Sequence, residues 1–254
     1  MSKLLSPPEN GYAIVGDIHG RADLLLRATE LIDPATTRFV VQDMLDKGPE
    51  VRKSLQIAQD IGAIALADNH GWVCANALSY PEHGERLWLD GWYRHYEDST
   101  LESFSIPRSG HAVRDAQRLR EQLENDGLWS LIFETTPYLE PTGDDFIAVH
   151  GGLLPGVPWD TQKVRLDVTA YSGQRWQYAP EQIFDDGHLL SMSASISPGV
   201  TSKRVITGHS HCWLGVAERM TDTGRRIRLA SRLWHGDPLF IYLTKSQEII
   251  TIEQ

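Results

Sequence analysis

The chain has 254 residues, of which 41% are hydrophobic and 23% charged, as is ordinary for a globular protein with a substantial core. Its 24 basic and 34 acidic residues give a net charge of −10, which argues against a surface that binds nucleic-acid backbones. Cys74 and Cys212 are too few for a disulfide framework or a cysteine metal site. No apolar run suits a signal peptide or a membrane span, so we expect a cytoplasmic protein without membrane contact.

Short apolar runs alternate with helical patterns in the first part of the chain. Residues 12–16, 38–42 and 63–67 are typical of buried strands, and residues 21–32 and 49–61 carry apolar side chains at helical spacing. Strands that alternate with crossover helices form a parallel sheet. The first part of the chain is therefore expected to form the parallel half of an α/β fold.

Residues 72–136 form a different, mainly helical and aromatic-rich stretch, which we expect to be a cap inserted in a single domain of residues 1–254. Within it, residues 114–124 are polar and charged at helical spacing, which is typical of a solvated helix. The aromatic residues either form the core of the cap or stack on a ring of the substrate; they are Trp72, Trp88, Trp92, Tyr93, Tyr96 and Trp129. Three arginines in the same stretch are available for a distal phosphate: Arg86, Arg94 and Arg108.

The last part of the chain is expected to be rich in strands. A long excursion with short helices, residues 164–199, precedes strands joined by tight turns, whose short connections imply antiparallel pairing. The strands are expected at residues 146–149, 204–207, 212–217, 225–230, 239–243 and 248–252. The whole pattern predicts an α/β protein with a mixed β sandwich flanked by helices.

Side chains that can bind metal ions follow the predicted strands. They are Asp17, His19, Asp43, Asn69, His150, His209 and His211. Sites in open α/β sheets lie beyond the carboxyl ends of the strands, so we expect these side chains to meet at one rim. Carboxylate oxygens and imidazole nitrogens suit divalent cations, and two cations about 3.5–4 Å apart can activate water and hold phosphate oxygens. The set therefore predicts a two-metal phosphoesterase site.

Five sequence motifs, in this order, resemble those of the calcineurin-like metallophosphoesterases. The similarity is to the phosphoprotein-phosphatase branch, with its bacterial Ser/Thr phosphatase and symmetrical dinucleoside-tetraphosphatase relatives. The motifs are Gly16-Asp17-Ile18-His19-Gly20, Asp43-Met44-Leu45-Asp46-Lys47-Gly48-Pro49, Asn69-His70, His150-Gly151-Gly152-Leu153 and Gly208-His209-Ser210-His211. The resemblance covers most of the chain and implies the four-layer fold of that family.

The resemblance also implies which ligand binds which ion. Asp17 and His19 would bind the first ion, Asp43 would bridge both ions, and the second ion would be completed by Asn69, His150 and His209. His211 resembles the second histidine of the Gly-His-x-His motif, which reaches the first ion, although the phosphoprotein-phosphatase branch often lacks it. The mixed nitrogen and oxygen ligands suit manganese, iron or zinc, with manganese expected to support activity in vitro.

Three further residues resemble the catalytic machinery of the family. His70 corresponds to the general acid that protonates the leaving oxygen, and Asp46 to the carboxylate that fixes its tautomer. Asp46 could instead cap the helix that begins near Pro49. Lys47 falls where the family carries an arginine for the phosphate, so we expect weaker or differently oriented phosphate binding.

The resemblance implies a phosphomonoesterase that acts on a small phosphorylated molecule or a phosphoprotein, by in-line attack of a metal-bridging hydroxide. One alternative is symmetrical cleavage of a dinucleoside polyphosphate, with a base held by the cap. Another is a homologue that binds a phosphorylated ligand without turnover, because four positions depart from the family pattern: Gln42, Lys47, Asp68 and Gly71. The sequence carries no signal for the oligomeric state.

Overall fold

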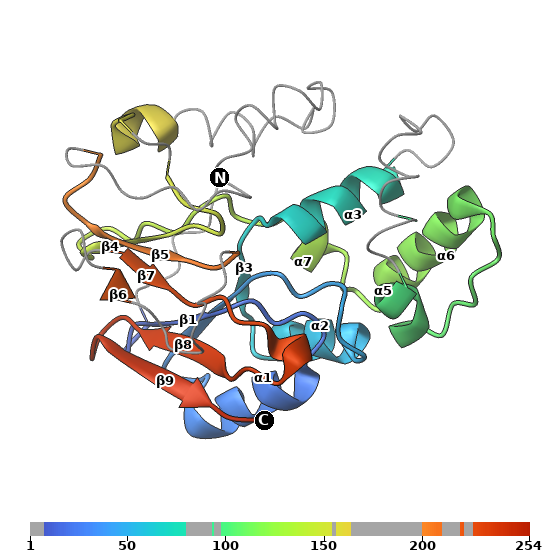
Figure 1. Cartoon of the computed structure of the whole chain (residues 1–254), viewed down its shortest axis with the longest axis horizontal. Helices are drawn as coiled ribbons and strands as arrows, with labels where there is room; N and C mark the ends of the chain where they lie inside the picture. Colours follow the sequence, from blue (N-terminus) through green and yellow to red (C-terminus); the bar gives the residue numbers. More distant parts are fainter. Residues whose placement is uncertain are drawn as a thin grey trace.

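Two β-sheets lie at the centre of the computed structural model, which describes residues 8–79, 93, 98–153, 156–163, 200–209, 219–220 and 226–254 (Figure 1). The first sheet has the order β3-β2-β1-β8-β9, formed by β1 (Tyr12–Val15), β2 (Arg38–Val41), β3 (Ile64–Ala65), β8 (Leu239–Leu243) and β9 (Glu248–Ile252). The second has the order β4-β5-β7-β6, formed by β4 (Phe146–Ala148), β5 (Arg204–Thr207), β6 (Arg219–Met220) and β7 (Arg226–Arg228).

Each sheet combines parallel and antiparallel pairs. In the first, β1, β2 and β3 are parallel, whereas β8 runs antiparallel to both β1 and β9. In the second, β4, β5 and β7 are parallel and β6 is antiparallel to β7. The predicted mixed β sandwich is confirmed, and the parallel strands of each sheet present their carboxyl ends at one rim.

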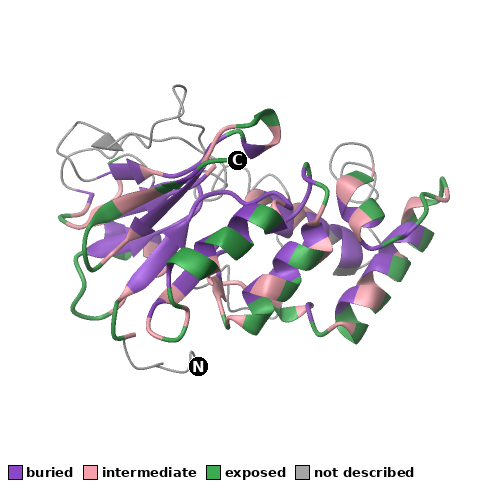
Figure 2. Ribbon diagram, turned by 90° about the horizontal axis from the view of Figure 1, so that it is seen from below, coloured by how far each residue is buried: buried purple, intermediate pink, exposed green. Residues whose placement is uncertain are grey.

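Successive side chains of a strand pack into different apolar layers of the protein. In β1, Tyr12 and Ile14 belong to the apolar cluster between the two sheets, whereas Ala13 and Val15 belong to the cluster between the first sheet and the helices. A third cluster, which includes Ile147, covers the outer face of the second sheet. Figure 2 shows the buried strands behind helices that present exposed residues on their outer side. This period of two is the pattern of strands buried on both faces.

Helices cover the outer face of the first sheet and extend beyond one end of it (Figure 1). They are α1 (Ala22–Leu31), α2 (Val51–Asp60), α3 (Asn69–Ser79), α5 (Asp98–Ser103), α6 (Ala112–Asn125) and α7 (Ser130–Phe133). The described part of residues 72–136 is mainly helical, as expected. Its residues Leu101, Leu119 and Leu128 lie in the same apolar cluster as Val15, so this helical region, the predicted insertion, continues the main core.

Two expectations about individual elements were wrong. Helix α6 is not simply solvated, because Ala116, Leu119 and Leu123 recur at helical spacing and are fully buried. The predicted strands 225–230 and 239–243 are not antiparallel neighbours: β7 lies in the second sheet and β8 pairs with β1. The chain crosses between the sheets through the short 3-10 helix η1 (Leu233–His235). The predicted strand 212–217 and the excursion 164–199 lie outside the described residues.

The expectations about the cysteines and about membrane spans can be compared with the described residues. Cys74 is a buried free thiol in the core, and burial raises its pKa well above the usual value. Cys212 lies outside the described residues. None of the described helices is both long enough and apolar enough to cross a membrane.

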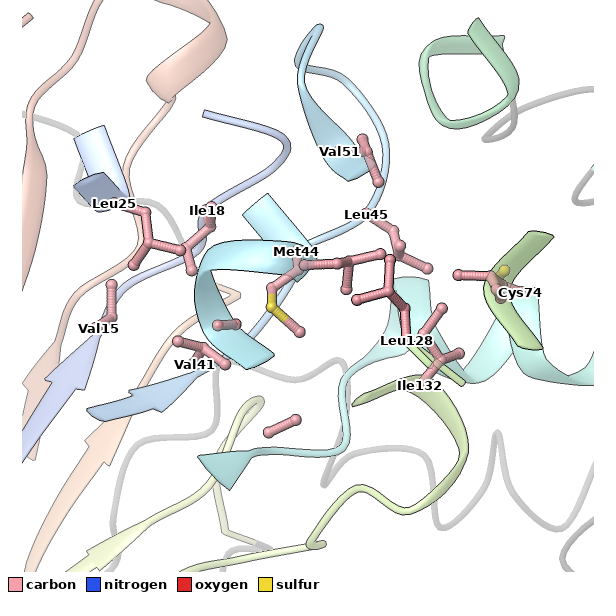
Figure 3. Packing of buried hydrophobic residues seen from close by; sticks show 14 of the residues in the cluster. Val15, Ile18, Leu25, Val41, Met44, Leu45, Val51, Cys74, Leu128 and Ile132 are labelled. Atoms are coloured by element: carbon pink, nitrogen blue, oxygen red, sulfur yellow. The ribbon is translucent and has the colours of Figure 1, made fainter. Parts of the chain in front are cut away.

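Apolar side chains anchor the loops that follow β1 and β2. Ile18 lies between two predicted ligands, and Met44 and Leu45 directly follow a third; all three are at most 4% exposed. Figure 3 shows them pointing into the cluster shared with the helices. Burial of such a side chain contributes about 1.5–3 kcal/mol. The burial of these residues fixes the loops and leaves their polar neighbours at the rim of the sheet.

Candidate metal centre

Six of the seven predicted ligands meet at the rim where β1, β2, β4 and β5 end. Each is linked to another by a contact of 3.5 Å or less, and together they are Asp17, His19, Asp43, Asn69, His150 and His209. Asn69 is the first residue of α3, and the others lie in the loops after the four strands. His211 lies outside the described residues.

Asp43 lies at the centre of this group. Its Oδ2 atom is 3.5 Å from His19 Nε2 and 3.5 Å from His150 Nε2. Its Oδ1 atom is buried and has no hydrogen-bond partner among the described residues. Two sets of atoms that could hold a metal ion share this carboxylate, one with His19 and His70 and one with His150 and His209, and the atoms of each set lie within 4.8 Å of one another. A carboxylate in this position can bridge two ions.

Hydrogen bonds fix the tautomers of the two histidines beside Asp43. His19 Nδ1 lies 2.9 Å from the Leu45 carbonyl, which can only accept, so Nδ1 carries the proton and Nε2 a lone pair. Gln42 Nε2 donates to the Val15 carbonyl at 2.8 Å, and this orients the amide so that its Oε1 faces His150 Nδ1 at 3.0 Å. His150 therefore also carries its proton on Nδ1. Both Nε2 atoms carry a lone pair and lie 3.5 Å from Asp43 Oδ2.

Asn69 adds a third kind of acceptor to the group. Its Oδ1 atom is 2.9 Å from His150 Nε2 and 3.1 Å from His209 Nδ1. Because His150 Nε2 carries a lone pair, its contact with Asn69 Oδ1 brings two acceptors together. Such convergence of acceptors is favourable when a cation lies between them.

Burial controls the charges of the site. It raises the pKa of Asp17 to about 6, against the opposing effects of the His209 N–H and the Lys47 charge. Burial also raises the pKa of Asp43 well above its usual value, and the negative charges of Asp68 and Asp17 add to this rise. The carboxylates thus need positive charge nearby to remain ionised.

The imidazoles of His19 and His150 are neutral near neutral pH. Burial lowers the pKa of His19 and of His150 well below the usual value, with neighbouring cationic groups adding to the effect. Neutral imidazoles, carboxylates and an amide oxygen form the ligand set that manganese, iron and zinc accept. Together with the unpaired Asp43 Oδ1, the chemistry of these residues fits a pair of divalent cations.

His70 is held by a carboxylate beside the metal-binding atoms. Its Nδ1 donates to Asp46 Oδ2 at 2.7 Å, and both residues are buried. The other carboxylate oxygen of Asp46 accepts the Thr100 hydroxyl at 2.6 Å. Asp46 does not cap α2, which begins at Val51 and has no side-chain cap. Because Nδ1 donates to Asp46, a second proton on the His70 ring would be carried by Nε2.

Lys47 supplies a positive charge at the same rim. Its Nζ is 3.1 Å from His19 Nε2 and 4.0 Å from the centre of the Trp234 ring. Burial lowers the pKa of Lys47, whereas the negative charges of Asp43 and Asp17 oppose this effect. The cation–π contact with Trp234 of η1 orients the ammonium group.

Two of the departures from the family pattern belong together. Asp68 caps α3, because its Oδ1 accepts the Gly71 N–H at 2.6 Å. Its Oδ2 accepts the Asp43 N–H at 2.9 Å. A Cβ atom at position 71 would lie 3.1 Å from Asp68 Oδ1, so glycine there gives the carboxylate room. The pair Asp68 and Gly71 supports the backbone of Asp43, the central predicted ligand.

Backbone strain is concentrated at the rim. Seven non-glycine residues in the described ranges have positive φ, and five of them belong to the predicted site: His19, Asp43, Asp46, Lys47 and His209. Such conformations cost on the order of 1–3 kcal/mol each. A Cβ atom at Gly208 would lie 2.2 Å from Asp17 Oδ1 and 2.7 Å from Gln42 Oε1, so only glycine fits between these side chains. The strain and the close approach are both concentrated where ligands would bind.

Comparisons with known proteins find structures with the same fold. No family model matches the sequence, and no curated protein matches it significantly. A protein described as a diadenosine tetraphosphatase has a TM-score of 0.58 at 18% identity, covering 97% of this chain and 95% of that chain. A protein serine/threonine phosphatase from Saccharomyces cerevisiae has a TM-score of 0.59 at 13% identity, covering 98% and 81%. The chain has the fold of these two phosphatase structures.

A third phosphatase structure is also similar. The cold-active protein-tyrosine phosphatase of a psychrophilic Shewanella has a TM-score of 0.53 at 14% identity, covering 95% of this chain and 80% of that chain. The fold of this chain is therefore shared by proteins named for different phosphorylated substrates. At these identities, the likeness shows the architecture and leaves the substrate of this chain to be argued from its own residues.

The structure also brings residues into the site that sequence reasoning missed. Thr100 and Trp234 contact Asp46 and Lys47, but each is remote in sequence from its partner and stands outside any motif. Of the three arginines considered for a distal phosphate, Arg86 and Arg94 lie outside the described residues.

The described residues of the insertion give its remaining arginine and two of its aromatics local partners. Arg108 bonds to Asp98 at 2.7 Å within the helical insertion. Trp129 stacks on Phe133 and packs against the main core, and Tyr93 packs there as well. Trp88, Trp92 and Tyr96 lie outside the described residues. For Trp129 and Tyr93 these contacts favour a core role over stacking on a substrate.

Proposed function

We propose that this chain is a phosphoester hydrolase that uses two divalent cations, one on each side of Asp43. The observation that carries the proposal is the pair of neutral histidines, His19 and His150, whose Nε2 atoms are each 3.5 Å from the same Asp43 oxygen. Asp17 would share one ion with His19, and the other ion would be shared by Asn69, His150 and His209. The fold that the chain shares with phosphatases supports this reaction class.

The other residues of the site have complementary tasks. Bound divalent cations would supply Lewis acidity toward the phosphate oxygens and water. Lys47 adds positive charge where charge develops on the phosphoryl group. His70, protonated on Nε2, delivers a proton to the leaving oxygen, and Asp46 keeps the ring in the orientation that this transfer needs.

We propose a phosphomonoester as the substrate, either a small molecule or a phosphoprotein. The similarity to the Saccharomyces cerevisiae phosphatase supports this class. Symmetrical cleavage of a dinucleoside polyphosphate is the second candidate, favoured by the nearly full mutual coverage between this chain and the protein described as a diadenosine tetraphosphatase. Manganese is the metal that we expect to support activity in vitro, and iron or zinc fits the same ligands.

The test combines metal analysis with a substrate screen. Purified protein should contain metal and hydrolyse phosphomonoesters in the presence of manganese, and Asp43→Asn should lose nearly all turnover. Asp60→Asn, at an exposed position at the end of α2, is the matched control and should retain activity. Full activity in Asp43→Asn would contradict the site assignment.

Product chromatography separates the candidate substrates. Conversion of diadenosine tetraphosphate to two molecules of adenosine diphosphate, at a higher kcat/KM than any phosphomonoester, would favour the second candidate. Metal retention without hydrolysis of either class would instead indicate a protein that binds phosphorylated ligands without turnover.

A further inference from the structure

Thr100 connects the helical insertion to the catalytic dyad of Asp46 and His70. Its hydroxyl donates to Asp46 Oδ1 at 2.6 Å and accepts the Asp46 backbone N–H at 3.1 Å. Both residues are 1% exposed, so water does not compete for these bonds. Thr100 lies on α5 and is 54 residues further along the chain than Asp46.

The two bonds determine the direction of the hydroxyl proton. Because the Thr100 oxygen accepts from the Asp46 backbone N–H, its own proton is directed to Asp46 Oδ1. The second carboxylate oxygen, Oδ2, accepts from His70 Nδ1 at 2.7 Å. The carboxylate of Asp46 is thereby held at both oxygens, and its rotamer is fixed by groups on two different helices.

The same hydroxyl supports a strained turn. Asp46 has a φ of 64° and the following Lys47 a φ of 66°, and both are uncommon for residues with side chains. The bond from the Asp46 backbone N–H to Thr100 stabilises this turn from the side of the insertion. Loss of the hydroxyl would therefore loosen both the carboxylate and the backbone that carries it.

We propose that Thr100 is a positioning residue for the general acid His70, so that α5 of the insertion completes the catalytic dyad. The proposal rests on the proposed phosphoester hydrolysis. A hydroxyl that donates to a carboxylate stabilises the anion, and the anion in turn holds the proton on His70 Nδ1. The helical insertion is then a component of the active site and not only a cover.

Contacts other than those of Thr100 also hold helix α5 in place, and one of them provides a matched control for a Thr100 variant. Leu101 and Phe104 are buried in the main core, and the Ser103 hydroxyl accepts the Arg52 backbone N–H of α2 at 2.8 Å. Ser103→Ala removes a hydrogen bond that attaches the same helix to the protein but leaves the Asp46 contacts in place. It therefore separates loosening of α5 from loss of the Thr100 hydroxyl.

The first experiment compares leaving groups. Thr100→Val should lower kcat about tenfold with an alkyl phosphate, because a hydrogen bond to a charged group is lost, and much less with p-nitrophenyl phosphate. Thr100→Ser keeps the hydroxyl and should restore the wild-type ratio of the two rates, and Ser103→Ala should not change it. If Thr100→Val does not fold, Thr100→Ala carries the same expectation. Equal losses with both substrates, or the same ratio change in Ser103→Ala, would overturn the proposal.

The second experiment needs no turnover. In nitrogen-15-labelled protein, the ring N–H signal of His70, assigned by its absence in His70→Asn, should move or exchange faster in Thr100→Val and stay in place in Ser103→Ala. An unchanged signal in Thr100→Val would rule out the positioning role. If the wild-type protein hydrolyses no phosphoester, the proposed function fails, and this signal still decides whether Thr100 holds the dyad.

Discussion

Gln42 offers the sharpest test of how the proposed metal ligands are oriented. Its amide donates to the Val15 carbonyl at 2.8 Å and faces His150 Nδ1 at 3.0 Å, so it fixes the tautomer that leaves the His150 Nε2 lone pair beside Asp43. Gln42→Leu keeps a side chain of similar size but removes both bonds. The His150 ring then loses the group that holds its proton on Nδ1.

The expected magnitude follows from the loss of this support. Removal of a group that orients a metal-binding histidine costs about 10–100-fold in metal affinity. The change also leaves two buried groups, the Val15 carbonyl and His150 Nδ1, without their partner, at about 1–3 kcal/mol each. We therefore expect a metal affinity at least tenfold lower and a reduced free energy of unfolding.

Titration calorimetry with manganese measures the affinity, and urea denaturation measures the free energy of unfolding. Gln59→Leu is the control, because this exposed glutamine of α2 makes a similar bond, to the Gly127 carbonyl at 3.0 Å, away from the site. The control should bind manganese as the wild type does. Unchanged affinity in folded Gln42→Leu would refute the orientation of His150 by Gln42.

Four further predictions follow from contacts at the rim. His70→Asn should lower kcat with an alkyl phosphate by about 10²–10⁴-fold and with p-nitrophenyl phosphate much less; equal losses in steady-state kinetics would exclude a general acid. Lys47→Met should lower kcat/KM about 10–100-fold at unchanged metal content, and an unchanged kcat/KM would show that its charge does not act on substrate. Gly208→Ala places a Cβ atom 2.2 Å from Asp17 Oδ1, so elemental analysis should find less metal, and full metal content would contradict the close approach. Asp68→Ala should lower the free energy of unfolding of the metal-loaded protein by about 2 kcal/mol in urea denaturation, since a helix cap and a buried bond are lost; no change would argue against that role.

The fold was largely predictable because its signals are local. The apolar runs of β1 and β2 each end two residues before an aspartate, Asp17 and Asp43, and successive side chains of these strands pack on opposite faces of the sheet. The partner of β8 was not predictable from short connections, because pairing with β1 joins residues more than 220 positions apart. Helix α6 was misjudged because its many charges obscured three apolar positions on one face.

The site, too, was predictable only in part. The ordered motifs predicted residues that converge, because parallel strands bring their carboxyl ends to one rim. Gln42 and Asp68 attracted notice only as departures from glycine, and their hydrogen bonds depend on contacts with distant loops. Thr100 had no sequence signal at all, since a threonine in a polar helix is unremarkable until the fold brings it to Asp46.

The central claim is that Asp43 lies between two metal ions. Anomalous diffraction from crystals grown with manganese tests it most directly, because the ions themselves are located. We predict two peaks flanking the Asp43 carboxylate, one on the side of His19 and one on the side of His150. A single peak, or peaks that do not contact Asp43, would contradict the account.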